Sequence, residues 1–440
     1  MPSYIIRNMR KMFSHCLKLS YKDTAQQNSY VTIPRAANSF DNTEIAANID
    51  EDIIDSLTGG RLVGSVTSFE NFAECPLRYY LRYGVDLKER EEFTFSPVNF
   101  GVVLHAVIRE VCDEIKKNGE SYYLISEEKR REMVKRSVAA ITDIYQNSIL
   151  KDSSRNSFMI KRMEDLADRT IWAMGEQLKC GDFVPFVFEH KFNMEVGDGD
   201  RKQLMSGTID RVDICENGTD VYVRIIDYKT GKKDFNIVKT YYGIDIQLMV
   251  YMEAAMKLVA KMRPGKNVIP AGVFYYNISD PIVSATTESA EEIEDKIKGE
   301  LRLKGMVNSD KDIVEKMDNT EGTSLNIPVS RKADGGFDSR RSKVMNTEQF
   351  NILGRFVDVR AIDTADRIVG GDIRRSPYKD GQFSSCDRCP YGAVCGFSVD
   401  LPGCNYRKLK KFDDEVLWNN IKEGVDENGK KMDTGAEERD

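Results

Sequence analysis

The chain has 440 residues, 41% of them hydrophobic and 31% charged, which is enough for one large domain or for a core with helical additions. Its 64 Lys and Arg against 71 Asp and Glu give a net charge of −7 and exclude a globally basic nucleic-acid-binding protein, so any contact with DNA must come from local patches. The lack of a long apolar run and of a secretion signal predicts a cytoplasmic protein without a membrane segment.

The first part of the chain is expected to be a leader followed by a short helix. Residues 1–60 show no sustained hydrophobic period and are expected to be poorly ordered. Thr67 and Glu70 have the spacing of a capping box, which predicts a helix that starts at Thr67. Cys75 is expected near the end of this helix, where Pro76 interrupts it.

Two longer helical regions and then a group of strands follow. From 101 to 117 the apolar residues recur at helical spacing and place His105 at the edge of the buried stripe, and a second helical region is expected over about 127–180. The period then becomes that of strands over 183–196, 204–215 and 221–228, and a turn at 216–219 predicts a hairpin between the last two.

The remaining sequence alternates between helical and strand patterns. We expect, in chain order, a helix over 244–260, a strand over 271–278, a helix over 290–304, a long polar loop over 307–343, a helix over 346–366 and a charged, disordered tail over 412–440. This order of elements predicts an α/β fold with a sheet core and helical additions.

A group of polar residues on the predicted hairpin has the chemistry of phosphodiester hydrolysis. If the two strands are neighbours, Asp210 and Asp227 converge at one end, and oxygen ligands of this kind suit Mg²⁺ or Mn²⁺. Asp227 and Lys229 are two residues apart in a strand and project to the same face. A lysine ammonium beside a metal can position and help deprotonate an attacking water. Taken alone, the run 227–231 is also typical of an ordinary strand that enters a turn.

Three further residues can belong to the same site. Gln247 and Tyr251 lie four apart on the next predicted helix, so their polar ends share a face and can hold a phosphate or a metal-bound water. His105 can add a ligand or an acid–base group, although a lone histidine on a helix edge is more often structural.

The cysteines indicate a second metal centre. Cys386, Cys389 and Cys395 supply three thiolates within ten residues, and Cys75 lies more than three hundred residues upstream. Tetrahedral zinc and a four-iron cluster both take four such ligands, and composition alone leaves the two about equal.

Four sequence blocks, taken in order, resemble the RecB-type branch of the PD-(D/E)XK nucleases. They are Gly101-x-x-Leu104-His105, Gly207-x-Ile209-Asp210-Arg211-x-Asp213, Asp227-Tyr228-Lys229-Thr230-Gly231 and Gln247-x3-Tyr251. The resemblance implies a mixed sheet flanked by helices, as in restriction endonucleases. It implies that His105, Asp210 and Asp227 are metal-site residues, that Tyr228 is a backbone-carbonyl ligand and that Lys229 is the catalytic lysine. Gln247 and Tyr251 would form the motif that follows the core, and Glu189 is a weaker candidate.

A second resemblance covers the cysteines. Cys75-Pro76-x-x-Tyr79-Tyr80, with the later C-x2-C-x5-C run, is similar to the iron–sulfur staple in the B subunits of AddAB-type helicase–nucleases. It implies a 4Fe-4S cluster on Cys75, Cys386, Cys389 and Cys395 that closes a nuclease domain over residues 65–407. Cys404 is a possible substitute ligand, and the remaining cysteines, Cys16, Cys112, Cys180 and Cys215, are expected to be ordinary thiols.

These resemblances imply a DNA exonuclease, acting on ends or single strands, in double-strand-break repair and recombination. No G-x-x-x-x-G-K-[ST] loop is present, so the chain is not expected to hydrolyse ATP, and a helicase–nuclease A subunit is the expected partner and motor. One alternative is a stand-alone exonuclease similar to those of CRISPR adaptation. Another is a silent iron–sulfur DNA-binding scaffold, against which the intact Asp210, Asp227 and Lys229 argue. Arg374-Arg375 can contact phosphates, and Tyr79, Tyr80 and Tyr83 can either stack on bases or pack around Cys75.

Overall fold

The computed structural model describes residue 49 and residues 63–88, 97–144, 154–196, 203–284, 288–401 and 404–437. The leader predicted over 1–60 therefore lies outside the described residues except for Ile49, and Cys16 lies outside them as well. None of the helices in the described ranges is long and apolar enough to cross a membrane.

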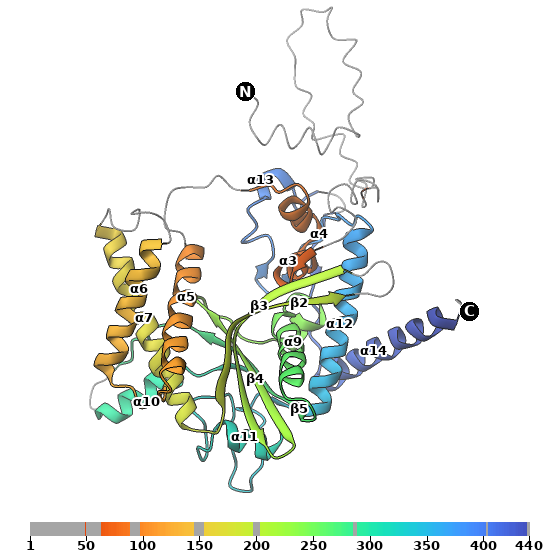
Figure 1. Ribbon diagram of the computed structural model, residues 1–440. Helices are drawn as coiled ribbons and strands as arrows, with labels where there is room; N and C mark the ends of the chain where they lie inside the picture. The colour runs from red at the N-terminus through yellow and green to blue at the C-terminus, as the bar shows by residue number, and fades with distance from the viewer. Residues whose placement is uncertain are drawn as a thin grey trace, which may run out of the picture.

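A mixed β-sheet forms the centre of the molecule (Figure 1). Its strands are β1 (Val63–Ser65), β2 (Val184–Val196), β3 (Gln203–Asn217), β4 (Asp220–Lys229), β5 (Asn267–Asn277), β6 (Lys304–Asn308) and β7 (Val344–Met345). Their order is β1-β3-β4-β5-β6-β7, and β2 also pairs with β3. The predicted hairpin is confirmed: β3 and β4 are antiparallel and turn at Gly218, whose φ of 60° suits a glycine. β4 and β5 are parallel, which places β4 inside the sheet.

Helices cover both faces of this sheet (Figure 1). One face is covered by α5 (Pro97–Lys117), α6 (Glu127–Ile144) and α7 (Ser154–Lys179), of which α6 packs on α5 and α7. The other face is covered by α3 (Val66–Glu74), α9 (Gln247–Met262) and α12 (Thr347–Val369). Leu104 and Ile108 of α5 are buried in the first cluster, and Phe69 and Phe356 are buried in the second. Each such side chain stabilises the fold by about 1.5–3 kcal/mol. Because both faces are covered, the interior of β4 is buried on both sides and its burial does not alternate.

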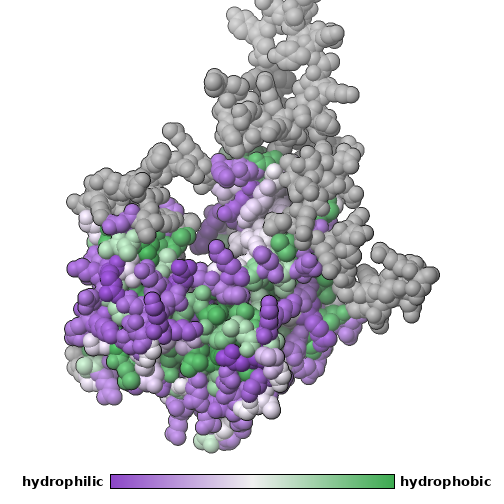
Figure 2. All heavy atoms as spheres, in the orientation of Figure 1, coloured by the Kyte–Doolittle hydropathy of each residue, from purple (hydrophilic) through white to green (hydrophobic). Residues whose placement is uncertain are grey.

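The surface seen in the same orientation is mixed in character. Figure 2 shows hydrophilic residues gathered over the group of α5, α6 and α7 at the left, with hydrophobic residues between them and toward the centre. The amphipathic pattern of these helices accounts for this arrangement, because their apolar stripes face the shared hydrophobic cluster and their charged faces remain in solvent.

Smaller elements surround these layers. They are α4 (Pro76–Tyr79), a π-helical turn (Tyr80–Gly84), α8 (Ile237–Tyr241), α10 (Ala290–Glu300), α11 (Lys311–Met317), α13 (Gly392–Cys395), α14 (Asp414–Glu437) and a second sheet of β8 (Tyr378–Asp380), β9 (Phe383–Ser384) and β10 (Arg407–Lys408). Cys75 lies between α3 and α4, as predicted. Figure 1 shows α13, from the C-terminal part of the chain, beside α4.

Three sequence-based expectations were wrong. The helix predicted to start at Thr67 starts at Val66, because Ser65 is the N-cap and accepts the N–H of Ser68 at 3.2 Å. The polar loop predicted over 307–343 contains α11, which begins because Asp310 accepts the N–H of Asp312 at 2.9 Å.

The third error concerns the tail predicted to be disordered over 412–440. Residues 414–437 form α14, whose Leu417 and Ile421 lie one turn apart and are buried in the same cluster as α12. The charge of this segment obscured an apolar stripe of helical spacing. The helical region predicted over 127–180 is present as two helices, α6 and α7.

Candidate active site

The β3–β4 hairpin brings together the two aspartates of the predicted site. The paired register runs to Arg211 opposite Ile226, and one further step along it places Asp210 opposite Asp227. The regular pairing ends there, and Asp210 Oδ2 accepts the backbone N–H of Tyr228 at 2.6 Å. Asp210 is 8% exposed and Asp227 2%, so both carboxylates lie in a region where an unbalanced charge is costly.

Asp210 is also the centre of a group of metal-ligand atoms. His105 Nδ1, from α5, lies 3.4 Å from Asp210 Oδ1 and 3.6 Å from Glu189 Oε1, which comes from β2. The three ligand atoms lie within 4.8 Å of one another. One imidazole nitrogen and two carboxylate oxygens at this spacing can hold a divalent cation. The structure thus brings His105 to Asp210 and adds Glu189, the weaker candidate, to the same group.

The carboxylates of Asp210 and Glu189 stabilise a positive charge at this site. Burial lowers the pKa of His105, but hydrogen bonds to Asp210 and Glu189 outweigh burial and raise the pKa to about 10. The site is therefore balanced by a positive charge, which either a proton on His105 or a cation can supply.

Asp227 and Lys229 project to one side of the end of β4, as their spacing predicted. The Lys229 ammonium forms an ion pair with Asp227 Oδ2 and lies 5.6 Å from the centre of the Tyr275 ring on β5. Burial and repulsion from Asp210 raise the pKa of Asp227 to about 6, although Lys229 acts in the opposite direction. An ammonium group thus stands beside a carboxylate pair, where it can hold a water or balance charge on a phosphate.

Gln247 and Tyr251 lie on the first turns of α9, with the side-chain amide of Gln247 donating to the Tyr251 hydroxyl at 2.9 Å. Both are buried. A side chain at Gly207, on β3, would meet the rings of Phe192 and Tyr251 at 2.7 and 3.0 Å, so glycine is required there for Tyr251 to approach the strand. The glycine at position 207 of the second sequence block is therefore required for steric reasons.

Glu70 is a residue of the site that sequence reasoning missed. Its Oε1 accepts the backbone N–H groups of Ile246 and Gln247 at 2.9 and 3.0 Å, so a side chain of α3 caps the start of α9. The partners are 176 and 177 residues away in sequence, and no local pattern reveals such a contact. Lys233 and Asp245 form a 3.0 Å ion pair nearby, and both influence the pKa of Glu70.

The structure also gathers the four predicted cluster cysteines. Burial raises the pKa of Cys386 to about 11, and the neighbouring thiols of Cys75, Cys389 and Cys395 add to this increase. Two contacts hold the distant segments together: Leu77 N–H donates to Arg374 O at 3.3 Å, and Ser385 Oγ donates to Glu74 O at 3.4 Å.

Other predicted side chains have structural partners. Arg374 pairs with Asp372 at 2.6 Å, and Arg375 donates to Cys395 O at 3.3 Å, so both are held by the fold around the cysteines. Tyr79 and Tyr80 are buried, which supports packing rather than stacking on bases, whereas Tyr83 is exposed. Cys112, Cys215 and Cys404 are buried, and Cys180 is half-buried.

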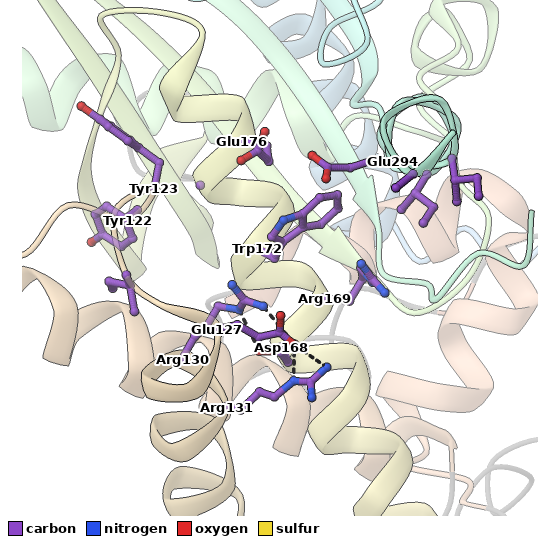
Figure 3. Close-up of a pocket in the computed structure, with 15 residues that line it drawn as sticks. Tyr122, Tyr123, Glu127, Arg130, Arg131, Asp168, Arg169, Trp172, Glu176 and Glu294 are labelled. Atoms are coloured by element: carbon purple, nitrogen blue, oxygen red, sulfur yellow. Dashed lines mark hydrogen bonds and ion pairs between the residues drawn. The ribbon is translucent and has the colours of Figure 1, made fainter. Parts of the chain in front are cut away.

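A separate pocket of about 510 Å³ lies among α6, α7 and α10 (Figure 3). Its arginines are balanced by acids: Arg130 Nε lies 2.7 Å and Arg131 Nε 3.7 Å from Asp168, as the dashed lines in Figure 3 indicate. Arg169 pairs with Asp280 at 3.3 Å. None of the residues that line this pocket belongs to the group around Asp210.

The mixed sheet, the paired aspartates and the lysine two residues later define the class of protein. Residues 64–396 match the family model described as the PD-(D/E)XK nuclease superfamily, and the chain belongs to this superfamily. The resemblance inferred from the four sequence blocks is thereby confirmed at the level of the family.

Comparison with curated proteins identifies more specific relatives within this superfamily. Proteins named as the B subunit of an ATP-dependent helicase/deoxyribonuclease are 33% identical over 380 residues in Thermoanaerobacter sp. (strain X514) and 34% identical over 401 residues in Lachnoclostridium phytofermentans. These alignments cover 84% and 89% of this chain but 33% and 34% of the relatives. The relative from Clostridium botulinum (strain Hall) is 32% identical over 441 residues, 96% of this chain and 38% of that protein. The chain thus spans about a third of the length of the relatives that it matches.

Proposed function

We propose that this chain is a metal-dependent nuclease that hydrolyses phosphodiester bonds in DNA. The observation that carries the proposal is the convergence of His105, Glu189 and Asp210 within 4.8 Å, beside the Asp227–Lys229 ion pair. His105, Asp210 and Asp227 would hold the cation together with the backbone carbonyl of Tyr228. Glu189 is a further ligand candidate. Mg²⁺ or Mn²⁺ fits the oxygen donors, and the imidazole favours Mn²⁺.

The remaining residues of the site have distinct roles in this proposal. When bound, the cation supplies a Lewis acid for the phosphate and lowers the pKa of a water. The Lys229 ammonium holds the attacking water and balances the charge that develops on the phosphate. Asp227 fixes Lys229 through their ion pair. Tyr251, oriented by the amide of Gln247, directs its hydroxyl toward a phosphate oxygen.

The test is cleavage of linear DNA labelled at either end, as duplex and as single strand. Asp227→Ala and Lys229→Ala should abolish Mg²⁺-dependent cleavage while the melting temperature stays near that of the wild type. Lys232→Ala, an exposed lysine three residues further on, is the matched control and should cleave normally. Unchanged cleavage by the two site variants contradicts the assignment, and binding of DNA ends without cleavage by the wild type supports a silent scaffold instead.

We also propose that Cys75, Cys386, Cys389 and Cys395 bind a 4Fe-4S cluster. The proposal is supported by the mutual influence of the four thiols, since Cys75, Cys389 and Cys395 each act on the pKa of Cys386. Four thiolates suit either tetrahedral zinc or a four-iron cluster, and the resemblance to the iron–sulfur staple favours the cluster.

Protein purified without oxygen should be brown and contain about four irons per chain. Cys389→Ala should lose the colour and the iron, whereas Cys180→Ala, at a half-buried position outside the group, should keep both. Zinc in place of iron contradicts the cluster assignment.

A role in a larger complex is the third part of the proposal. The relatives are named as B subunits of ATP-dependent helicase/deoxyribonucleases, which supports an A-subunit partner that supplies the motor. Exonuclease action at DNA ends or single strands and work in double-strand-break repair are further parts of this proposal and rest on the resemblance of the sequence blocks. Addition of such a motor partner should make degradation of linear DNA depend on ATP. Full, ATP-independent exonuclease activity without any partner favours the stand-alone enzyme of the CRISPR-adaptation type.

A further inference from the structure

A second pocket, of about 820 Å³, carries an excess of positive charge. It lies among α8, α12, α14 and residues 407–412. The basic residues that line it are Arg360, Arg367, Arg407, Lys408 and Lys410, and the acidic ones are Asp363 and Glu423. Five cations against two carboxylates leave three positive charges in excess, on a chain whose net charge is −7.

Most of these cations have no carboxylate partner among the described residues. Arg367 pairs with Asp372 at 2.8 Å and with Asp363 at 3.7 Å. Arg407 donates to the carbonyl of Ala73, and no ion pair to Arg360, Arg407, Lys408 or Lys410 is found within the part of the chain that the structure describes. The pocket of Figure 3 differs in this respect, because Arg130 pairs with Asp168 there. Arg169 of the same pocket pairs with Asp280. A polyanion can supply the charge that the second pocket lacks.

Aromatic rings line the same pocket. Tyr241 and Phe356 are stacked with ring centres 5.3 Å apart, and Tyr242 and Phe412 lie nearly parallel with centres 6.4 Å apart. Tyr241, Tyr242 and Phe412 are half-buried, so part of each ring remains accessible. The Tyr242 hydroxyl accepts the backbone N–H of Lys410 at 3.2 Å, which ties a ring to the basic segment. Rings beside unpaired cations are the combination that holds a single strand of nucleic acid.

The pocket adjoins the nuclease site through shared elements. Ala73 lines it and lies one turn after Glu70 on α3. Gly243, also in its wall, precedes Asp245 and Gln247 by only a few residues, and a Cβ at Gly243 would touch Ala73 at 3.4 Å. A nucleic-acid strand bound in the nuclease site would therefore have this basic and aromatic surface beside it, on the neighbouring side of α3.

We propose that this pocket binds a segment of single-stranded nucleic acid outside the nuclease site, with phosphates on Lys408, Lys410 and Arg407 and with bases against Tyr242 and Phe412. This inference rests on the proposed function, because the bound strand would be part of the DNA that the nuclease site cleaves, and it adds a separate strand-binding site. Cations along a groove follow the backbone, while rings accept any base, so the pocket holds a strand without reading its sequence.

The charge is tested by binding of a labelled oligo(dT) to the 440-residue chain in EDTA, where cleavage does not interfere. The double variant Lys408→Gln/Lys410→Gln should weaken binding about tenfold. Between about 50 and 200 mM salt, it should also reduce the slope of log K against log salt by about 1.4, because each of the two lost phosphate contacts contributes about 0.7. Lys135→Gln/Lys261→Gln removes two exposed lysines elsewhere and should leave the slope unchanged. An equal slope in both double variants overturns the proposal.

The bases are tested separately. Tyr242→Ala and Tyr242→Phe both lose the hydroxyl that accepts the Lys410 N–H, but only Tyr242→Phe keeps the ring. Tyr242→Ala should bind oligo(dT) about tenfold more weakly than Tyr242→Phe, and the two variants should bind inorganic polyphosphate equally. Oligo(dT) binding that is unaffected in Tyr242→Ala overturns the assignment to nucleic acid and leaves a general polyanion site. Melting temperatures near that of the wild type exclude unfolding as the cause.

Cleavage of the same oligonucleotide in Mg²⁺ separates the two proposals. Cleavage by the wild type with an unchanged salt slope in Lys408→Gln/Lys410→Gln overturns the pocket and leaves the nuclease. A reduced slope without any cleavage by the wild type overturns the nuclease and leaves the pocket as a strand-binding site.

Discussion

Glu189 faces Asp210 across the β2–β3 ladder with its backbone in the left-handed region. The flanking pairs are Phe188 with Arg211 and His190 with Ile209, which leaves Glu189 opposite Asp210. The φ of Glu189 is 48°, and its carboxylate lies 3.6 Å from His105. A non-glycine residue in this region costs on the order of 1–3 kcal/mol, and the surrounding sheet must enforce it. Strain at a ligand candidate is typical of a position kept for function.

Glu189→Gly should therefore separate stability from metal binding. Glycine adopts a positive φ without steric cost, so the variant should melt at or slightly above the wild-type temperature. Loss of the Glu189 carboxylate, one of the three ligand groups that lie within 4.8 Å of one another, should weaken Mn²⁺ binding at least tenfold, as measured by calorimetry. A fall in melting temperature with unchanged Mn²⁺ affinity would show that Glu189 serves the fold rather than the cation.

Asp213 is a buried charge on which the stability of the sheet depends. It is fully buried between Arg211 and Arg224, whose nitrogens lie 2.5 and 2.8 Å from Oδ2. Burial alone raises the pKa of Asp213, but the two arginines outweigh it and hold the pKa below its usual value. Asp213→Ala leaves two buried cations without a partner and should lower the free energy of unfolding by about 3–5 kcal/mol in urea denaturation.

The control for Asp213 is Glu127→Ala. Glu127 forms an exposed ion pair with Arg131, and its loss should cost less than about 1 kcal/mol. Because the pKa of Asp213 is depressed in the folded state, its contribution is present above the unfolded pKa of about 3.9 and is lost as the pH falls through the folded pKa. A similar loss of stability in both variants contradicts the role given to Asp213.

The sequence predicted the centre of the site better than its surroundings. Strand periods placed Asp210 and Asp227 on neighbouring strands, and the two-residue spacing predicted that Lys229 shares a face with Asp227; both are local patterns. The contact of Glu70 with α9 and the burial of Leu417 depend on tertiary packing. A charged sequence such as that of α14 also contains too few apolar residues to reveal its stripe without a partner surface.

Glu70 is a positioning residue that acts through α9. Glu70→Ala removes the acceptor for two backbone N–H groups and should lower kcat by about tenfold through Gln247 and Tyr251, with a cost of about 1 kcal/mol in stability. Glu70→Gln retains an acceptor oxygen and should recover most of kcat. Equal loss of kcat in both variants contradicts a capping role.

The pH dependence of stability provides an independent check on Glu70. The pKa of Glu70 is raised by burial and, to a lesser extent, by Asp245. It is lowered by Lys233, the Gln247 N–H and Lys229, and the resulting pKa is about 7. The folded state therefore holds a proton that the unfolded chain has lost above about pH 4.3, so stability falls as the pH rises from there to about 7. Glu70→Gln should flatten this part of the melting-temperature profile. A profile as steep as that of the wild type contradicts the raised pKa.

We propose that Asp210 binds the metal ion and that Lys229 takes part in the chemical step at the same site. The most direct test measures Mn²⁺ binding and DNA cleavage in the same preparations of Asp210→Ala and Lys229→Gln. Asp210→Ala should lose both, whereas Lys229→Gln should bind Mn²⁺ nearly as well as the wild type and cleave at least a hundredfold more slowly. Normal cleavage by Lys229→Gln, or wild-type Mn²⁺ affinity in Asp210→Ala, would contradict the account.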